Sequence, residues 1–187
     1  VSSGAVAAGV AAVGLSDRPV DMPTLQAISA AGQSRLVEAY NQALGRHGLV
    51  GAQLLVSPMD FVQPNQYLHL RSTMNRLLEL GCVPIVNEND AIANDELRYG
   101  DNDRNAAVIS NSVNADVLVL LADMDGVFKA DPRTVSSATL VPLVRVGDPL
   151  LSVAADAGGS GRGGGGMASK LVAARMASSS GIRSVIA

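Results

Sequence analysis

The sequence predicts an α/β protein with a largely parallel sheet, for three reasons. Short apolar runs alternate with longer segments of helical periodicity, as in sheets built from strand–helix–strand crossovers. The run VPIV at 83–86 is apolar at every position, as expected of a parallel strand buried on both faces. Polar residues follow it at once, and open α/β sheets bind ligands at the edge where their strands end. We therefore expect the functional site in two polar clusters, Asn87, Glu88, Asn89 and Asp90, and Gly100, Asp101, Asn102 and Asp103.

The composition indicates one globular domain. Of 187 residues, 48% are hydrophobic, 17% are charged and 3% are aromatic, which gives an adequate core and excludes intrinsic disorder. The net charge of −3 offers no basic surface for nucleic acid. No apolar run reaches the ~18 residues of a membrane span, and no signal peptide is visible. Cys82 is the single cysteine, so it has no partner for an internal disulfide, and we expect a reducing, cytoplasmic location.

Both ends of the chain are expected to lie inside a larger domain. VSSGA at 1–5 predicts the end of a strand that turns into a helix, and IRSVIA at 182–187 predicts a strand. We interpret the chain as part of such a domain, truncated at both ends.

The first half of the chain predicts three helices and two strands. A helix of small residues covers 3–13, and the turn residues of GLSDRP end it. Thr24 is the expected N-cap of a second helix that reaches His47, with a break near Gly32. A strand at 51–57 comes next, then a helix at 65–80 with Gly81 as its C-cap glycine, then the strand at 83–87.

The second half continues the alternation of helices and strands. A polar segment at 91–99 is compatible with a hairpin, and the helix after residue 101 carries Ala106, Ile109 and Val113 on one face. A strand at 117–121 leads to a turn at Asp125 and Gly126. We further expect a short strand at 140–146, a helix near Asp148, a helix at 167–180 and a final strand.

The segment GGSGRGGGGMASK at 158–170 is a candidate phosphate-binding loop. Glycines let the backbone approach a phosphate, and the helix after them offers unpaired N–H groups. Lys170 is one of only two lysines, and a cation in the first turn opposes the helix dipole, which favours a bound anion as its reason. A flexible linker is the alternative. The segment is not a Walker A loop, because Leu171 follows Lys170.

Two uses fit the polar clusters at 87–90 and 100–103. Carboxylates after a strand suit Mg²⁺, which takes one or two of them together with waters and substrate phosphates. They equally suit the ammonium group of a substrate, with the asparagine amides on its carboxylate. The alternative is a solvated acidic loop with Asx turns, in which Asp103 is only the N-cap of its helix.

Ser3 and Asp123 are candidates by their positions. Ser3 lies where a helix begins, so its hydroxyl is placed either for a ligand carboxylate or phosphate or as an ordinary N-cap. Asp123 follows the strand at 117–121, where it faces a nucleotide or metal or only precedes a turn. His47 and His69 have no partners that indicate a zinc site or a catalytic triad.

Six segments, taken in order, resemble the amino acid kinase family over essentially the whole chain. They are VSSGA, AAGQSRL, VPIVNENDAI, YGDNDRNAA, LLADMDGVFKADPR and GGMASKLVAA. The pair VNENDA and GDND is similar to the members that phosphorylate L-glutamate. The resemblance implies a three-layer α/β/α sandwich with a mainly parallel central sheet, spanning residues 1–187 as a partial kinase domain.

The resemblance also implies an activity and its participants. The reaction is ATP-dependent phosphorylation of the γ-carboxylate of L-glutamate with Mg²⁺, the first step of proline biosynthesis, in a homo-oligomer that L-proline inhibits. Ser3, Asp90 and Asn102 match the family's glutamate-binding residues. Lys170 matches the lysine that stabilises the transition state, and Asp103 matches the aspartate that organises the catalytic lysines. The nucleotide contacts correspond to Ala122 (often Thr in the family), Asp123, Gly164, Gly165, Gly166, Met167, Ala168, Ser169 and Lys170.

The chain departs from the family's pattern at its ends. Members begin with a strand and a glycine loop that bears another lysine, and many end in an RNA-modification-enzyme-like (PUA) domain; this sequence includes neither. Two alternatives stay open. One is another amino acid kinase, acting on N-acetylglutamate, aspartate, carbamate or UMP, and the other is a non-catalytic fragment that binds glutamate or proline.

Overall fold

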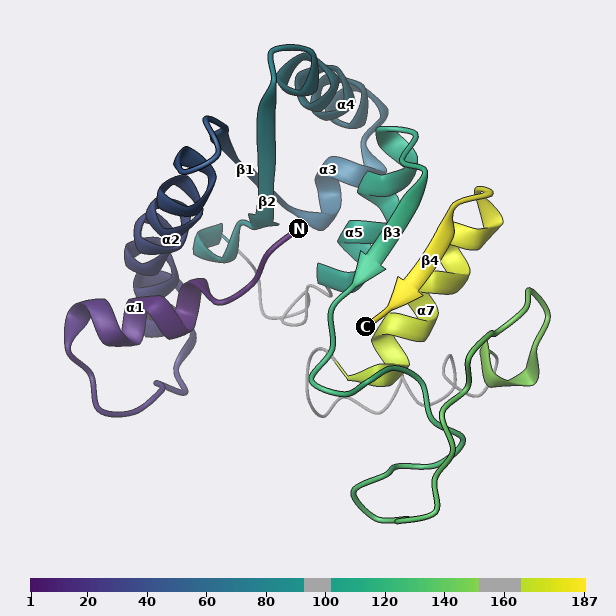
Figure 1. Ribbon diagram of the computed structural model, residues 1–187. Coiled ribbons are helices and arrows are strands. Elements are labelled where there is room, and N and C mark those ends of the chain that lie inside the picture. The colour runs from purple at the N-terminus through teal and green to yellow at the C-terminus, as the bar shows by residue number, and fades with distance from the viewer. Residues whose placement is uncertain (93–101, 152–165) are drawn as a thin grey trace. The chain divides into compact units, whose positions relative to one another are not determined.

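The computed structural model describes residues 1–92, 102–151 and 166–187 (Figure 1). The chain divides into two compact units, Val1–Asn102 and Asp103–Ala187, and each is described by itself. Both units contain parallel strands flanked by helices, so the predicted α/β class with parallel pairing is confirmed.

The first unit is built on one parallel pair of strands. β1 (Val50–Val56) pairs with β2 (Cys82–Glu88) over their full lengths, in a register that sets Val50 beside Cys82 and Val56 beside Glu88. α2 (Met22–Gly45) packs on β1, and α4 (Pro64–Glu79) packs on β2. The other elements of the unit are α1 (Ala5–Val13), α3 (Pro58–Val62) and the 3₁₀ turn η1 (Asp90–Ile92).

The start of α2 differs from the prediction. Asp21 is the N-cap, and its carboxylate accepts a hydrogen bond of 3.0 Å from the Thr24 N–H, so the prediction of Thr24 as the cap was wrong by one turn. Asp21 holds an extended backbone before the helix, and Pro23 lies in the first turn, where its missing N–H is not needed.

The predicted break at Gly32 is also absent, because α2 is continuous through it. Gly32 instead lets α1 and α2 touch backbone to backbone. A Cβ atom built on Gly32 lies 1.9 Å from the Ala5 carbonyl oxygen, and one built on Gly9 lies 1.8 Å from the Ile28 carbonyl oxygen. The contact therefore has no room for a side chain at either position.

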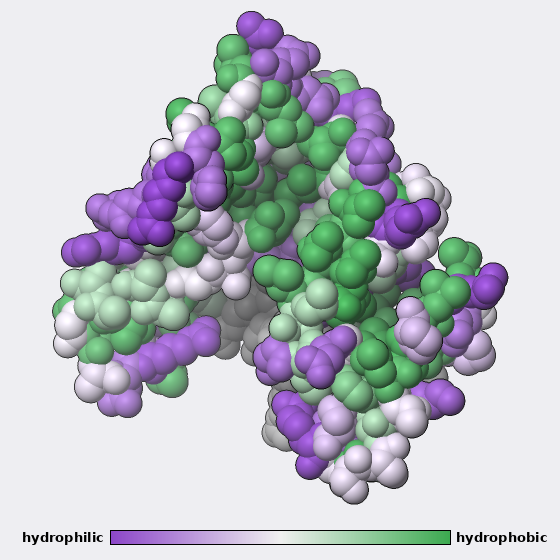
Figure 2. Space-filling view, viewed as in Figure 1, coloured by the Kyte–Doolittle hydropathy of each residue, from purple (hydrophilic) through white to green (hydrophobic). Residues whose placement is uncertain are grey.

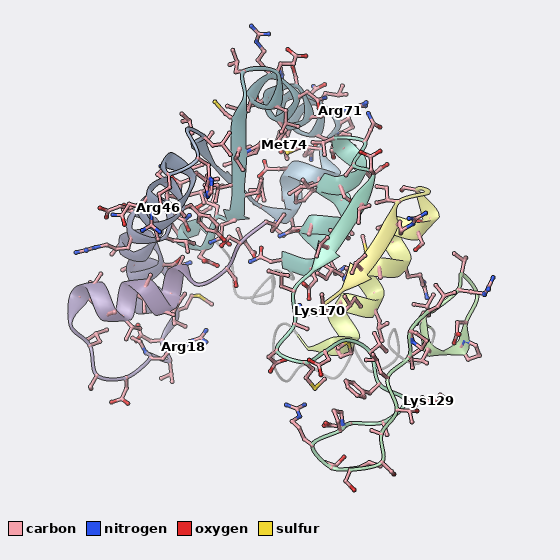
Figure 3. The ribbon with its side chains drawn as sticks, in the orientation of Figure 1. Arg18, Arg46, Arg71, Met74, Lys129 and Lys170 are labelled. Atoms are coloured by element: carbon pink, nitrogen blue, oxygen red, sulfur yellow. The ribbon has the colours of Figure 1, made fainter. Side chains whose placement is uncertain are left out.

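The helix before β2 ends as the sequence predicts. Gly81 has a φ of 74°, the left-handed conformation that glycine adopts without strain. Met74 is 1% exposed on the inner face of α4 and is labelled in Figure 3. β2 follows, and its last four residues, from Ile85 to Glu88, are all buried.

The second unit contains a second parallel pair. β3 (Val117–Leu120) pairs with β4 (Arg183–Ile186), and α7 (Met167–Ser179) packs on both strands. α5 (Asn102–Ser112) precedes β3, and its first residue is the last of the first unit. The core joins α5, α7 and the strands through Ala107, Leu118, Leu120, Ala173, Ala177 and Ile182.

The predicted strand at 140–146 is wrong. Only one isolated antiparallel bridge occurs there, between Phe128 and Leu140, and the Val141 N–H bonds the Val127 carbonyl. Pro142 follows and has no N–H to donate, so the pairing cannot extend. Near Asp148, residues 149–151 are helical as expected.

β3 shows the alternation of a sheet with one covered face. Leu118 and Leu120 are buried, while Val117 and Val119 are exposed together with Leu121, which follows the strand. These exposed side chains contribute to the apolar surface over β3 in Figure 2. Among the described residues, no helix is long and apolar enough to cross a membrane.

The α1–α2 contact gives a test of the fold. Gly32→Ala should lower the free energy of unfolding by about 1–3 kcal/mol, because the new methyl group forces the two helix backbones apart. Gly45→Ala in the same helix is the control, since a Cβ there meets nothing within 4 Å. Chemical denaturation of the intact protein measures both, and equal effects would contradict the close contact.

Candidate functional site

The carboxamide of Asn87 is the centre of a buried hydrogen-bond network at the end of β2. Its Nδ2 donates to Oε1 of Gln33 on α2 at 2.9 Å. Its Oδ1 accepts from the Glu88 N–H at 2.9 Å and from Nδ2 of Asn102 at 3.2 Å. Asn87 is 2% exposed and Gln33 is 6% exposed, so the amides are shielded from water. The network fixes Asn102 relative to α2 and β2.

A second set of bonds holds the N-terminal segment beside β2. The Ser2 N–H donates to the Val86 carbonyl at 2.8 Å, and the Ser2 carbonyl accepts from Nδ2 of Asn102 at 2.9 Å. The Tyr40 hydroxyl, from α2, donates to Oγ of Ser2 at 2.9 Å. Gly4, with a φ of 100°, then turns the chain into α1. Ser3 is thereby fixed between two anchored residues, with its side chain exposed.

These residues enclose a pocket of about 480 Å³ in the first unit. The pocket brings together Ser3, Asp90 and Asn102, which the sequence predicted as one binding site although they lie far apart in the chain. Its lining residues are Ser3, Gly4, Ala5, Val6, Ala7, Val10, Arg18, Asn87, Glu88, Asp90 and Asn102.

The pocket contains two carboxylates of different character. Asp90 on η1 accepts a hydrogen bond of 2.7 Å from the Ser29 hydroxyl, which fixes its orientation. Glu88 is 6% exposed, and burial together with the charge of Asp90 raises its pKa to about 7. Arg18, from the loop after α1, is the cationic side chain of the lining and is labelled in Figure 3.

The second unit brings together Lys170 and Asp103, which the sequence predicted as a catalytic pair. Nζ of Lys170 lies 3.1 Å and 3.3 Å from the two carboxylate oxygens of Asp103, and both side chains are 14% exposed. The Ser169 hydroxyl donates to Asp103 at 2.6 Å. Lys170 lies in the first turn of α7 (Figure 3), so Asp103 offsets the repulsion between the lysine and the helix dipole.

The start of α7 has the form of an anion site. Gly166 is the N-cap, and none of the described side chains caps the helix there. Backbone N–H groups at a helix start are the usual partners of a bound anion. Met167, Ala168 and Ser169 form this turn together with Lys170. The predicted loop residues Gly164 and Gly165 lie outside the described part of the chain, as do residues 93–99 of the hairpin predicted at 91–99 and the residues Gly100 and Asp101. Ala91 and Ile92 belong to the 3₁₀ turn η1.

β3 ends at Leu120, one residue earlier than predicted, so Leu121 separates it from Ala122 and Asp123. The Ala122 N–H donates to the carbonyl of Ala187, while the side chain of Asp123 is exposed. Within residues 1–92, 102–151 and 166–187, no group of three or more His, Cys, Asp or Glu side chains is placed to hold a metal ion.

Sequence reasoning missed the contribution of α2 and of the loop before it. Ser29 orients Asp90 and Gln33 pairs with Asn87, yet neither was a candidate. Ser29 and Gln33 are four residues apart and therefore lie on one face of α2. This spacing of two polar residues could have marked them as candidates in the sequence. Nε2 of Gln33 is buried with no hydrogen-bond partner among the described residues. Nothing in the sequence pattern around Arg18 indicates that this residue lines a pocket.

Comparison with known proteins identifies the family to which the chain belongs. The model of the amino acid kinase family matches residues 1–187, and the chain belongs to this family. It is 47% identical over 186 residues to a protein named glutamate 5-kinase from Pseudomonas entomophila (strain L48) and 48% identical to one of the same name from Pseudomonas syringae pv. tomato. The match covers 100% of this chain and 50% of each relative, so the chain spans about half the length of the curated relatives it matches.

The raised pKa of Glu88 predicts a pH-dependent stability. A carboxyl group whose pKa is higher in the folded state stabilises the fold fully below its ordinary value of 4.5, and this contribution is lost as the pH rises through about 7. Glu88→Gln keeps a neutral group at every pH. The melting temperature of this variant relative to wild type should therefore rise between pH 5 and pH 8. Glu38→Gln, at an exposed position of α2, is the control, and parallel behaviour of the two variants would contradict the burial effect.

Proposed function

We propose that the protein transfers the γ-phosphoryl group of ATP to the γ-carboxylate of L-glutamate, forming L-glutamyl 5-phosphate, the first step of proline biosynthesis. The observation that carries the proposal is the pocket that gathers Ser3, Asp90 and Asn102. The names of the relatives support L-glutamate as the acceptor. A cytoplasmic location, a homo-oligomer and inhibition by L-proline belong to the same proposal.

The pocket suits a small amino acid. Asp90 offers a fixed carboxylate for the ammonium group, while Asn102 and Ser3 offer polar groups for the acid groups of the ligand. The acceptor needs no general base, because a glutamate carboxylate with a pKa of ~4.3 is already ionised at neutral pH. Catalysis then rests on positioning and on stabilising charge.

The α7 turn suits the phosphates of ATP. Its first-turn N–H groups would bind the phosphate oxygens, and Lys170 would stabilise the negative charge that develops on the phosphoryl group. Asp103 positions the lysine through the contacts at 3.1 Å and 3.3 Å. Bound Mg²⁺ would neutralise phosphate charge, and it usually takes most of its ligands from phosphates and waters. We assign it no protein ligand.

Acceptor-dependent formation of ADP tests the proposal. The intact protein should release ADP with L-glutamate and not with N-acetyl-L-glutamate, L-aspartate or UMP at the same concentration. Preferential turnover of any of the other three would overturn the assignment of the acceptor.

Replacement of the lysine should affect turnover more than acceptor binding. Lys170→Ala should lower kcat by about 10²–10³-fold, the usual effect of losing one group that stabilises transition-state charge, with little change in the KM for L-glutamate. Lys129→Ala, the other lysine of the chain, is exposed in the same unit and serves as the control. Unchanged turnover in the Lys170 variant would rule out this role.

Replacement of the pocket aspartate should do the reverse. Asp90→Ala should raise the KM for L-glutamate by about tenfold or more, because a charge-assisted hydrogen bond to the ammonium group is lost. The KM for ATP should stay within twofold of the wild-type value. Asp17→Ala, at an exposed position of the loop after α1, is the control, and a normal KM for L-glutamate in the Asp90 variant would contradict the assignment.

A further inference from the structure

Glu88 is a buried carboxyl group that the proposed reaction does not use. It is the last residue of β2, it is 6% exposed, and it lines the same pocket as Asp90. Its N–H is bound by Asn87, but among the described residues no group donates a hydrogen bond to its carboxylate. Burying an ionised carboxylate without a partner is costly, so the group is either neutral or awaits a cation.

We propose that Glu88 is a specificity residue that receives the ammonium group of the acceptor amino acid beside Asp90, and that binding of the acceptor drives a proton from Glu88 to solvent. The inference rests on the proposed function. The O–H bond of the Glu88 carboxyl group breaks, the proton passes to the buffer, and the carboxylate keeps the electron pair. The new ion pair then replaces the lost proton as the partner of the carboxylate.

The surroundings of Glu88 support this role. Asp90 repels the ionised form of Glu88. One ammonium group between the two carboxylates would offset both this repulsion and the free-energy cost of burying the charge of Glu88. Arg18 lines the pocket but makes no ion pair with Glu88 in the described residues, and β1 sets the apolar Val56 beside it. Ser29 and Asn102 are neutral neighbours of the site.

Among the described residues, the other titratable side chains near Glu88 are Asp90 and Arg18 in the pocket lining and Tyr40, whose hydroxyl donates to Oγ of Ser2. The glutamine variant of Glu88 keeps all three. Proton release that the variant loses therefore comes from Glu88.

Calorimetry of ligand binding tests the inference. L-glutamate is titrated into the intact protein in phosphate and in Tris, whose ionisation enthalpies differ. At pH 7 binding should release about half a proton per site, and release should rise at pH 6 and approach zero at pH 9. Glutarate, which lacks the amino group, should bind without this release.

The variant adds a second readout. Glu88→Gln should bind L-glutamate about tenfold more weakly at pH 8, with no proton release and with unchanged affinity for glutarate. Glu38→Gln should match wild type. Wild-type binding of L-glutamate without proton release, or equal losses for both ligands in Glu88→Gln, would overturn the inference and leave the proposed function standing. No binding of L-glutamate by wild type would overturn both, and the wild-type titration decides the matter even if the variant does not fold.

Discussion

The hydrogen bonds of the Asn87 side chain hold the candidate acceptor site together. One carboxamide accepts from Asn102 and from the Glu88 N–H and donates to Gln33, all away from water. A buried amide that lost these partners would pay the full desolvation penalty of each unpaired group, so the arrangement is all or none. The same network holds Asn102, the last residue of the first unit, against the end of β2.

The two units stabilise their partly buried charged groups in different ways. In the first, Glu88 and Asp90 share a pocket with Arg18, and burial together with the charge of Asp90 raises the pKa of Glu88 to about 7. In the second, Lys170 is neutralised by Asp103 at the start of a helix whose dipole opposes the lysine. Asn102 and Asp103 are consecutive in the chain, and they are the last residue of the first unit and the first residue of the second.

The strands and the position of the candidate pocket could be predicted from local sequence. The apolar run before Asn87 predicts β2. The polar residues directly after it predict the ligand-binding edge, because open α/β sheets bind ligands where their parallel strands end. The cap of α2 was misplaced because Asp21 and Thr24 both suit an N-cap and only the geometry distinguishes them. Gln33 lies 54 residues from Asn87 in the sequence, and no periodicity records such a tertiary pairing. Gly32 likewise signals a break locally but serves a helix contact.

A crystal structure of the intact protein with L-glutamate tests the central claim most directly. The account predicts ligand density in the pocket lined by Ser3, Asp90 and Asn102, with the ammonium group on the side of Glu88 and Asp90. The Asn87 bonds to Gln33 and Asn102 should be unchanged. Density for L-glutamate elsewhere, or an ammonium group directed away from both carboxylates, would contradict the account.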